Sequence, residues 1–221
     1  ATLPPLSSVA NIFVKCYKDK HATLQALSEN QSVSKEMALI LEALCAIRTN
    51  VIIAGEKNTL KTTVLSALSK LLPNNGRGVV VDNMQEFKVN ARNYSNYNLS
   101  NVEGENAELE ILNSIIMSNP EKLSINDPNE RILSYVTKNA LTGYKGTMLT
   151  VCAKSAEDAI DKIALSIIKE NPNIDYKTAK TFALKAFDMI IFTKRDESGK
   201  RRIASISEID IDDKDKPIKD I

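Results

Sequence analysis

The stretch that decides the fold runs from Asn50 to Thr63 and reads N-V-I-I-A-G-E-K-N-T-L-K-T-T. Its β-branched apolar start predicts a buried strand, and the apolar spacing from Lys61 to Leu72 predicts a helix. A strand, a short loop and a helix in this order are the context that a phosphate-binding loop requires. In such a loop Lys61 would neutralise phosphates, Thr62 would ligate Mg²⁺, and backbone N–H groups would cradle the anion.

Two residues of this loop depart from the usual chemistry. The position before the lysine normally holds glycine, because the backbone must approach the phosphates closely, but here it is Leu60. Glu56 places a negative charge where it would repel phosphate, and Lys57 offsets it in part. A plain β-turn-α connection that binds nothing is therefore the alternative interpretation.

Outside this stretch, apolar segments alternate in the manner of strands joined by helices, which predicts a mostly parallel sheet covered on both faces. The expected strands are Asn50 to Ala54, Gly78 to Asp82, Leu123 to Ile125, Gly146 to Cys152, Met189 to Thr193 and Arg202 to Ile209. The expected helices are Ser34 to Ile47, Lys61 to Leu72, Ala107 to Met117, Asn129 to Leu141, Ser155 to Glu170 and Asp175 to Phe187.

The remaining segments carry weaker signals. Gly199 predicts a hairpin turn between the last two strands, and Pro73 to Gly76 predicts a turn. Asn11 to Tyr17 resembles a strand, whereas Asn90 to Asn101, which is rich in asparagine, reads as a loop. We expect the charged segment after Ile209 to fray.

Composition excludes several classes of protein. The chain has 221 residues, 43% of them hydrophobic and 26% charged, which is typical of a globular domain rather than a disordered or collagenous chain. Its apolar runs are too short for a membrane-spanning helix. The formal net charge of +1 gives no overall field that would favour nucleic acid or acidic lipid. The chain opens at Ala1 without a signal-peptide pattern, which we interpret as a processed or trimmed start.

Cysteine and histidine are too few for metal or nucleophile chemistry. Cys16, Cys45 and Cys152 are widely spaced and odd in number, which favours buried thiols in a reducing compartment over a disulfide framework. The single histidine, His21, lies in a polar stretch, so neither a zinc site nor a Ser-His-Asp or Cys-His site is expected.

Motifs spread along the chain resemble the motor domain of the secretion and pilus traffic ATPases, closest to the Tad-type pilus branch and its conjugation and type II secretion relatives. Leu3-Pro4-Pro5 and the segment Val14 to Tyr17 match the family's L-P-P and I-R-K-F. Ser34 to Met37 matches S-x-E-M, and the loop G-G-T-G-S-G-K-T-T aligns without a gap on Gly55 to Thr63. The family's acidic stretch falls on Asp82 to Glu86. Its N-I-E-G falls on Asn101 to Gly104, and its T-G-H-D-G-S-M-G-T-I-H-A-N-S on Thr142 to Ser155.

The departures from the family pattern fall on residues that carry chemistry. The arginine pair before N-I-E-G aligns with Tyr94 and Asn98. The strand that ends in a catalytic-site glutamate aligns on Leu123 to Asn129, where Asn126 or the displaced Asp127 stands in place of the glutamate. Cys152 replaces the family's histidine, and Leu149 replaces a glycine. Glu86 and Asp127 are weak catalytic candidates, and a helix cap or a solvated loop carboxylate is the simpler interpretation of each.

The resemblance implies an α/β fold of the RecA-like P-loop NTPase type, with three layers, a mostly parallel sheet and a C-terminal β-hairpin. Residues 1–20 would end an N-terminal domain or form a linker arm, 21–210 would be the ATPase-type domain, and 211–221 a charged tail. ATP and Mg²⁺ would bind at Gly55, Lys61, Thr62 and Thr63, with Thr62 as the metal ligand, although the altered loop makes binding doubtful.

Three functions remain open. A structural or regulatory pseudo-ATPase subunit of a pilus or secretion machine is favoured, an active ATP-hydrolysing motor is the alternative, and a nucleotide-free module comes third. The resemblance implies a cytoplasmic assembly peripheral to the inner membrane, either a homo-oligomer or a hexamer mixed with a paralogous ATPase, docked on an inner-membrane platform protein. No nucleic acid partner is expected, because the chain lacks a basic-aromatic strip.

Overall fold

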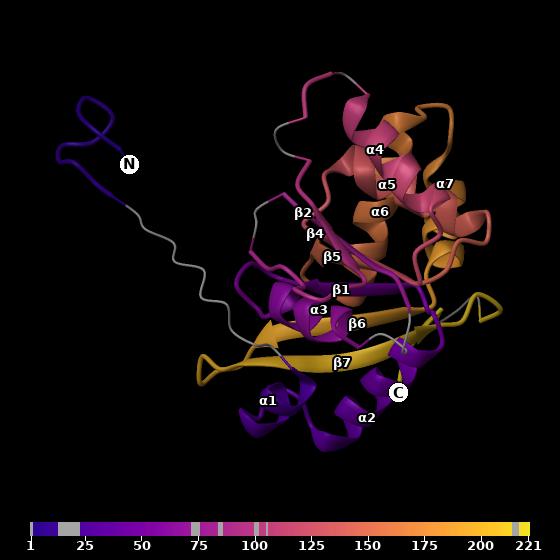
Figure 1. The fold of residues 1–221 in the computed structure, drawn as a ribbon, viewed down its shortest axis with the longest axis horizontal. Helices are drawn as coiled ribbons and strands as arrows, with labels where there is room; N and C mark the ends of the chain where they lie inside the picture. The colour runs from indigo at the N-terminus through magenta and orange to yellow at the C-terminus, as the bar shows by residue number, and fades with distance from the viewer. Residues whose placement is uncertain are drawn as a thin grey trace.

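The computed structural model describes residues 2–12, 23–71, 76–83, 86–99, 102–104, 106–213 and 217–221. In these residues one sheet of eight strands, ordered β3-β2-β4-β5-β1-β6-β7-β8, lies between helices on both faces (Figure 1). The strands are β1 (Val51–Gly55), β2 (Gly78–Asp82), β3 (Tyr94–Tyr97), β4 (Lys122–Asn126), β5 (Thr147–Cys152), β6 (Met189–Arg195), β7 (Arg201–Ile209) and β8 (Ile218–Asp220). The helices are α1 (Leu24–Glu29), α2 (Lys35–Ala46), α3 (Lys61–Ser69), α4 (Ala107–Met117), α5 (Glu130–Leu141), α6 (Ala156–Glu170) and α7 (Tyr176–Ala186).

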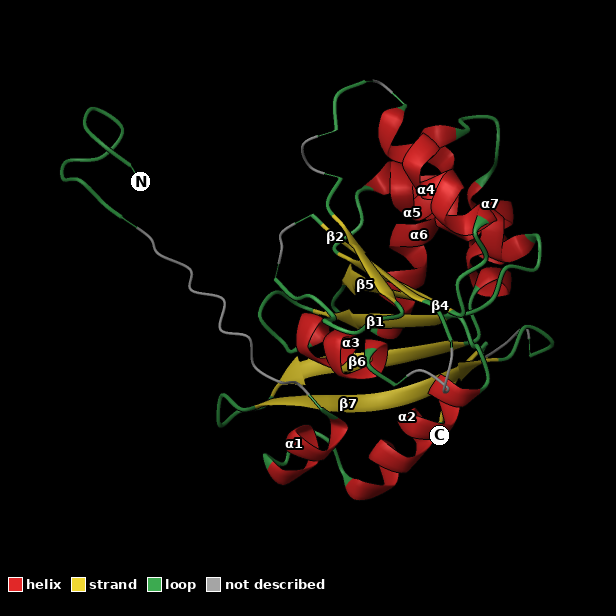
Figure 2. Ribbon diagram, in the orientation of Figure 1, coloured by secondary structure: helices red, strands yellow, loops and turns green. Residues whose placement is uncertain are grey.

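The predicted mostly parallel sheet is confirmed. The strands from β3 to β6 pair in parallel, and β7 and β8 add an antiparallel edge through the hairpin between β6 and β7 (Figure 2). Gly199 takes a φ of +80° in that hairpin, as expected of a turn glycine. Because β1 pairs with both β5 and β6, it lies near the middle of the sheet and ends at the loop that begins at Gly55.

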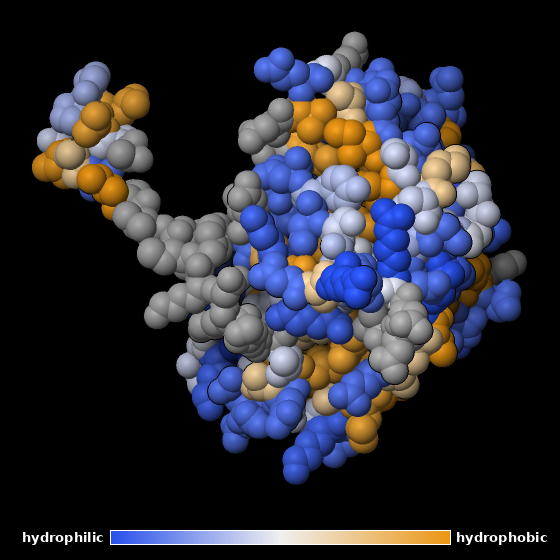
Figure 3. Space-filling model, in the orientation of Figure 1, coloured by the Kyte–Doolittle hydropathy of each residue, from blue (hydrophilic) through white to orange (hydrophobic). Residues whose placement is uncertain are grey.

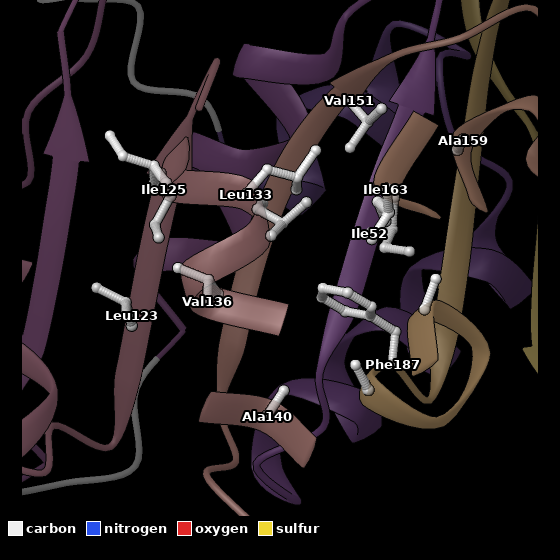
Figure 4. Close-up of a cluster of buried hydrophobic side chains, with 14 of the residues drawn as sticks. Ile52, Leu123, Ile125, Leu133, Val136, Ala140, Val151, Ala159, Ile163 and Phe187 are labelled. Atoms are coloured by element: carbon white, nitrogen blue, oxygen red, sulfur yellow. The ribbon is translucent and has the colours of Figure 1, made fainter. Parts of the chain in front are cut away.

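Side chains that alternate along the strands build two cores, one on each face of the sheet. Ile52 and Ala54 belong to the cluster under α4, α5, α6 and α7, part of which is shown in Figure 4. Val51 and Ile53 belong to the cluster under α1, α2 and α3, called the second core below. Burying an aliphatic side chain of this size stabilises the fold by about 1.5–3 kcal/mol. Two covered faces thus explain why the strands are apolar throughout rather than alternating.

Asn50 joins three segments at the amino ends of the central strands. Its side chain is fully buried and donates 3.0 Å hydrogen bonds to the carbonyl oxygens of Tyr144 and Ala186. Its amide oxygen accepts a 3.0 Å hydrogen bond from the N–H of Thr147. Every polar atom of this buried side chain therefore has a partner, and the starts of β1 and β5 are tied to the end of α7.

The predicted helix starts are confirmed by their caps. Ser34 Oγ accepts from the N–H of Met37 at 3.1 Å, and Ser155 Oγ accepts from that of Asp158 at 3.1 Å. Asp158 Oδ2 in turn accepts a 2.7 Å hydrogen bond from the N–H of Lys154, one residue before the position that a capping box would use. The helix boundaries agree with the sequence because the caps satisfy N–H groups that the first turn leaves unpaired.

Two expectations are wrong. The segment from Asn90 to Asn101 is not all loop, because Tyr94–Tyr97 forms β3 at the edge of the sheet. An edge strand needs few apolar residues, so the polar sequence of β3 gave no apolar pattern from which a strand could be predicted. The tail does not simply fray either, since Ile218–Asp220 pairs with β7 as β8 and Lys219 forms ion pairs with Asp210 and Asp213.

Other expectations fall on residues that are not described, including His21, Cys16 and residues 73–75 of the predicted turn. The predicted strand from Asn11 to Tyr17 lies mostly there too, and Asn11 itself makes an isolated antiparallel bridge to Thr2. The face seen in Figure 3 is mostly hydrophilic, with apolar side chains gathered over α4 and near α2. None of the helices in the described residues is long and apolar enough to cross a membrane.

Candidate functional site

The candidate site lies at the carboxyl edge of the parallel strands, where ligands bind in open α/β sheets. The loop after β1 lies there, together with the last residues of β2, β4 and β5. Within the sheet, Gly55 is aligned with Cys152 of β5 and with Thr193 of β6. The sheet topology therefore brings together side chains from five segments that are far apart in the sequence.

Backbone geometry in the loop explains where glycine is required. Gly55 has a φ of +154°, and a Cβ at this position would collide with the carbonyl oxygen and hydroxyl of Thr193. Leu60 has a φ of +91° and a ψ of −2°, which is the left-handed conformation that glycine would adopt without strain. For a leucine this costs about 1–2 kcal/mol.

The side chain of Leu60 is half-buried and packs against the second core. The loop thus keeps the glycine-like backbone at the position before Lys61, while the leucine is partly accommodated by the core. The replacement of glycine by Leu60 therefore mainly strains the backbone at the start of α3.

The loop is closed by hydrogen bonds to one carbonyl group. Lys61 Nζ donates to the carbonyl oxygen of Glu56 at 2.6 Å, and Thr59 Oγ1 lies 2.7 Å from the same atom. Thr59 Oγ1 also lies 2.9 Å from Thr193 Oγ1. The ammonium group of Lys61 is thereby held over the loop. Thr63 lies in the first turn of α3 and makes no side-chain hydrogen bond to the residues that the structure describes.

Thr62, Asp82, Glu86, Asn126 and Thr150 form a connected set that we call the polar cluster. Thr62 Oγ1 lies 2.8 Å from Glu86 Oε2 and 3.1 Å from Asn126 Oδ1. Asn126 Nδ2 donates to Asp82 Oδ1 at 3.1 Å and to Glu86 Oε2 at 3.4 Å. Thr150 Oγ1 donates to Asn126 Oδ1 at 3.2 Å. Asp82, Asn126 and Thr150 are each 3% exposed, so the cluster is largely shielded from water.

The two catalytic candidates from the sequence are placed differently. Glu86 belongs to the polar cluster, next to Thr62. Asp127 is exposed, with a φ of +49°, and it reaches the cluster only through its backbone N–H, which donates to Thr150 Oγ1 at 2.8 Å. The side chain at the end of β4 that faces the cluster is therefore the amide of Asn126 and not the carboxylate that follows it.

The positions expected to carry arginine also separate in space. Tyr94 lies at the amino end of β3, and its hydroxyl donates to the carbonyl oxygen of Ser69 while its ring packs on Gly78. Burial raises the pKa of the Tyr94 phenol above its usual range. Asn98 follows β3 at the carboxyl edge and lines a cavity of about 310 Å³ together with Asp82 and Lys88. Tyr94 is thus a packing residue, whereas Asn98 lies beside the site.

Cys152, which stands where the resemblance places a histidine, ends β5 next to Gly55 and is half-buried. Its carbonyl oxygen accepts a hydrogen bond from Lys162. Sequence reasoning missed Thr150 and Thr193. The signal that could have found them is their place at the carboxyl ends of two predicted strands, where polar residues are unusual in a buried sheet.

The polar cluster fits the ligand chemistry of Mg²⁺. Its hydroxyl, carboxylate and amide oxygens are the hard donors that this ion prefers, and Mg²⁺ usually takes one or two carboxylates together with water and substrate phosphates. In the described residues, no group of three or more Asp, Glu, His and Cys side chains could hold a metal by itself. The residues present are therefore suited to a Mg²⁺ ion that arrives with a phosphate ligand.

Sequence comparison finds related proteins over most of the chain. It is 24% identical over 209 residues to the type IV secretion system protein VirB11 of Bartonella quintana, an alignment that covers 91% of this chain and 56% of that protein. The chain spans about half the length of the curated relatives it matches. No protein-family model matches the sequence.

Structural comparison finds the same fold in solved secretion and pilus proteins. The VirB11 ATPase of Brucella suis, solved in complex with sulphate, superposes with a TM-score of 0.69 at 18% identity, covering 84% of this chain and 54% of that one. The pilus retraction motor PilT with bound ADP superposes with a TM-score of 0.59 at 12% identity, covering 81% of this chain and 50% of the other. These matches confirm the predicted RecA-like fold with its C-terminal hairpin.

Proposed function

Since the chain belongs to the secretion and pilus traffic ATPase family, we propose that it is an ATPase-fold subunit with impaired ATP binding and hydrolysis. It would serve a pilus assembly or secretion machine through assembly or regulation rather than through its own turnover. By its motifs the sequence resembles the Tad-type branch of the family, whereas the matched relatives are named for type IV secretion and pilus retraction.

Asn126 is the observation that supports this proposal most directly. Hydrolysis of a nucleotide requires a group that orients and polarises the attacking water as charge develops on the transferred phosphoryl group. At the end of β4 the side chain is an amide, which cannot accept a proton as a carboxylate can. Both polar atoms of the Asn126 amide already have hydrogen-bond partners. The nitrogen donates to Asp82 and Glu86, and the oxygen lies within hydrogen-bonding distance of Thr62 and Thr150.

The loop supports weak nucleotide binding for two reasons. Leu60 holds the glycine conformation only under strain, and Glu56 adds an exposed carboxylate beside the phosphate position. When bound, ATP would be held by Gly55, Lys61, Thr62 and Thr63, and Mg²⁺ by Thr62 with the neighbouring cluster oxygens. The metal would supply charge neutralisation on the phosphates.

An active motor remains the second candidate, and one observation favours it. Thr62, Asp82 and Glu86 converge within hydrogen-bonding distance of Asn126, so oxygen atoms of the kind that Mg²⁺ prefers lie together and one of them belongs to the Glu86 carboxylate. If Glu86 takes the role of the missing glutamate, the protein would hydrolyse ATP and convert it to movement of pilin or secretion components.

Partners and location follow from the same proposal. The sheet, its two cores and the helix caps are formed, so the fold could still present surfaces for a homo-oligomer or for a hexamer mixed with a paralogous ATPase. The assembly would dock on an inner-membrane platform protein from the cytoplasmic side. No nucleic acid partner is proposed. Pull-down from the native cell with mass spectrometry tests this, and recovery of only unrelated proteins would count against both candidates.

Calorimetric titration with ATP, with and without Mg²⁺, tests the proposal itself. We expect a dissociation constant weaker than about 1 mM, which corresponds to about −4 kcal/mol of binding free energy. A micromolar constant would overturn impaired binding. A phosphate-release assay on the same sample separates the two candidates, because turnover at about 1 per second or faster would identify an active motor.

A further inference from the structure

The hairpin between β6 and β7 is strongly cationic and lies beside the phosphate loop. Five basic residues stand between Lys194 and Arg202, against two acidic residues, Asp196 and Glu197. β6 runs parallel to β1 and continues for two residues past Thr193, the residue aligned with Gly55. The hairpin therefore extends beyond the edge at which the loop lies, as Figure 1 shows.

The alternation of side chains along β6 places Arg195 on the face of the loop. The hydroxyl of Thr193 contacts Thr59, which belongs to the loop before α3. Residues two apart in a strand lie on the same face, so Arg195 shares this face one step, about 7 Å, further along. Arg201 is directly opposite Arg195 in the antiparallel pair and lies on the same face.

This pairing of like charges is unfavourable unless an anion is present. Residues directly opposite in an antiparallel pair have Cβ atoms about 5 Å apart, and like charges there destabilise the hairpin. On the other face Arg202 forms an ion pair with Asp196, with 2.9 Å between Nε and Oδ2. Arg195 and Arg201 are exposed and form no ion pair with any residue in the described ranges.

We propose that Arg195 and Arg201 form an anion-binding pair that receives the diphosphate or triphosphate group of a ligand held at the loop. Two guanidinium groups offer forked donors that match phosphate oxygens, and the α3 N-terminus with Lys61 supplies the remaining positive charge. The pair would supply cations to a site beside which Asn98 holds one of the two positions that align with the family's arginines. This inference deepens the proposed function, because it depends on a phosphate ligand at the loop.

The test compares two double variants that remove the same charge from the same hairpin. Arg195→Gln/Arg201→Gln removes the proposed pair, and Lys194→Gln/Lys200→Gln is the matched control, since neither lysine forms an ion pair within the described part of the chain. Inorganic tripolyphosphate is titrated calorimetrically at low salt, and ATP is titrated in a second arm, so that inorganic and nucleotide sources of the phosphate group are told apart. Thermal unfolding of each variant checks that both fold.

We expect the arginine variant to bind tripolyphosphate at least tenfold more weakly than the native chain, and the lysine variant to lie within threefold of it. If both variants lose the same affinity for tripolyphosphate, the hairpin attracts the anion only through its overall positive charge, and the proposal is overturned. Absence of binding by the native chain at millimolar tripolyphosphate would also overturn it, while leaving impaired nucleotide binding intact. If Lys61→Ala abolishes binding and the arginine variant does not change it, the loop binds phosphate without the hairpin and the proposal is again wrong.

Discussion

Replacing Asn126 with aspartate would test the geometry of the polar cluster directly. The two side chains have nearly the same shape, so the change exchanges an amide nitrogen for a carboxylate oxygen at a buried position. Two hydrogen bonds, to Asp82 at 3.1 Å and to Glu86 at 3.4 Å, would become contacts between carboxylate oxygens. We expect the Asn126→Asp variant to be destabilised in a way that depends on pH.

The size of the effect follows from these distances. Two unit charges 3.1 Å apart repel by about 5 kcal/mol at an effective dielectric constant of 20. This value is an upper bound on the cost, because the new carboxyl group can take up a proton and become neutral. A pKa raised by about two to three units for the new carboxyl corresponds to roughly 3–4 kcal/mol. The folded state then holds the extra proton above pH 4, where the unfolded state releases it. The free energy of unfolding therefore falls as the pH rises from about 4 to about 7.

Urea denaturation at several pH values between about 4 and 8 measures this difference. Asn113→Asp is the matched control, because Asn113 is exposed and its Oδ1 accepts from the Tyr135 hydroxyl, as a carboxylate would. Millimolar Mg²⁺ should raise the free energy of unfolding of the Asn126→Asp variant by about 2.7 kcal/mol, if the Mg²⁺ concentration is a hundred times the dissociation constant of Mg²⁺ from the variant. A variant whose stability follows that of the native chain at every pH would refute the placement of Asp82 and Glu86 around Asn126.

Three further outcomes are expected. Leu60→Gly should relieve about 1–2 kcal/mol of backbone strain, offset by lost packing, and should tighten ATP binding measured by calorimetry while hydrolysis stays near background; turnover at about 1 per second or faster would contradict it. Asn50→Ala should lower the free energy of unfolding in urea by about 3 kcal/mol or more, because three buried backbone groups lose their partner; a loss below about 1 kcal/mol would argue against it. Burial raises the pKa of Tyr94, so above pH 10 the unfolded state loses the proton that the folded state keeps, and stability falls. Tyr94→Phe should cost about 1 kcal/mol at neutral pH and flatten this alkaline loss, and an unchanged alkaline slope would count against the argument.

Most strands and helices could be predicted because their signals are local. Gly78 to Asp82 and Ala107 to Met117 match β2 and α4 at both ends, since apolar residues mark both elements within a few positions. β3 and β8 could not be found in this way, because edge strands gain their stability from pairing with a neighbour rather than from their own composition.

The candidate site was only partly predictable for the same reason. The spacing of its residues predicts the loop from Gly55 to Thr63, and Glu86 is a candidate because the acidic stretch of the resembled family falls on Asp82 to Glu86. Which of Asn126 and Asp127 faces the cluster depends on the positive φ of Asp127 and on where β4 ends. The contact of Thr150 with the polar cluster and that of Thr193 with the loop depend on strand order, which local sequence does not encode.

The hydrogen bonds of Asn50 bear on the order in which the chain can fold during synthesis. They join residues 94 and 136 positions apart, and β1 is flanked by two strands that follow it by similar separations. Such distant contacts form slowly, because a long loop must close before they contribute. Until the ribosome has released the segment through β6, β1 can pair with β5 on one side but has no neighbouring strand on the other. A nascent chain interrupted before Met189 would therefore present β1 with one unpaired edge and be prone to aggregation.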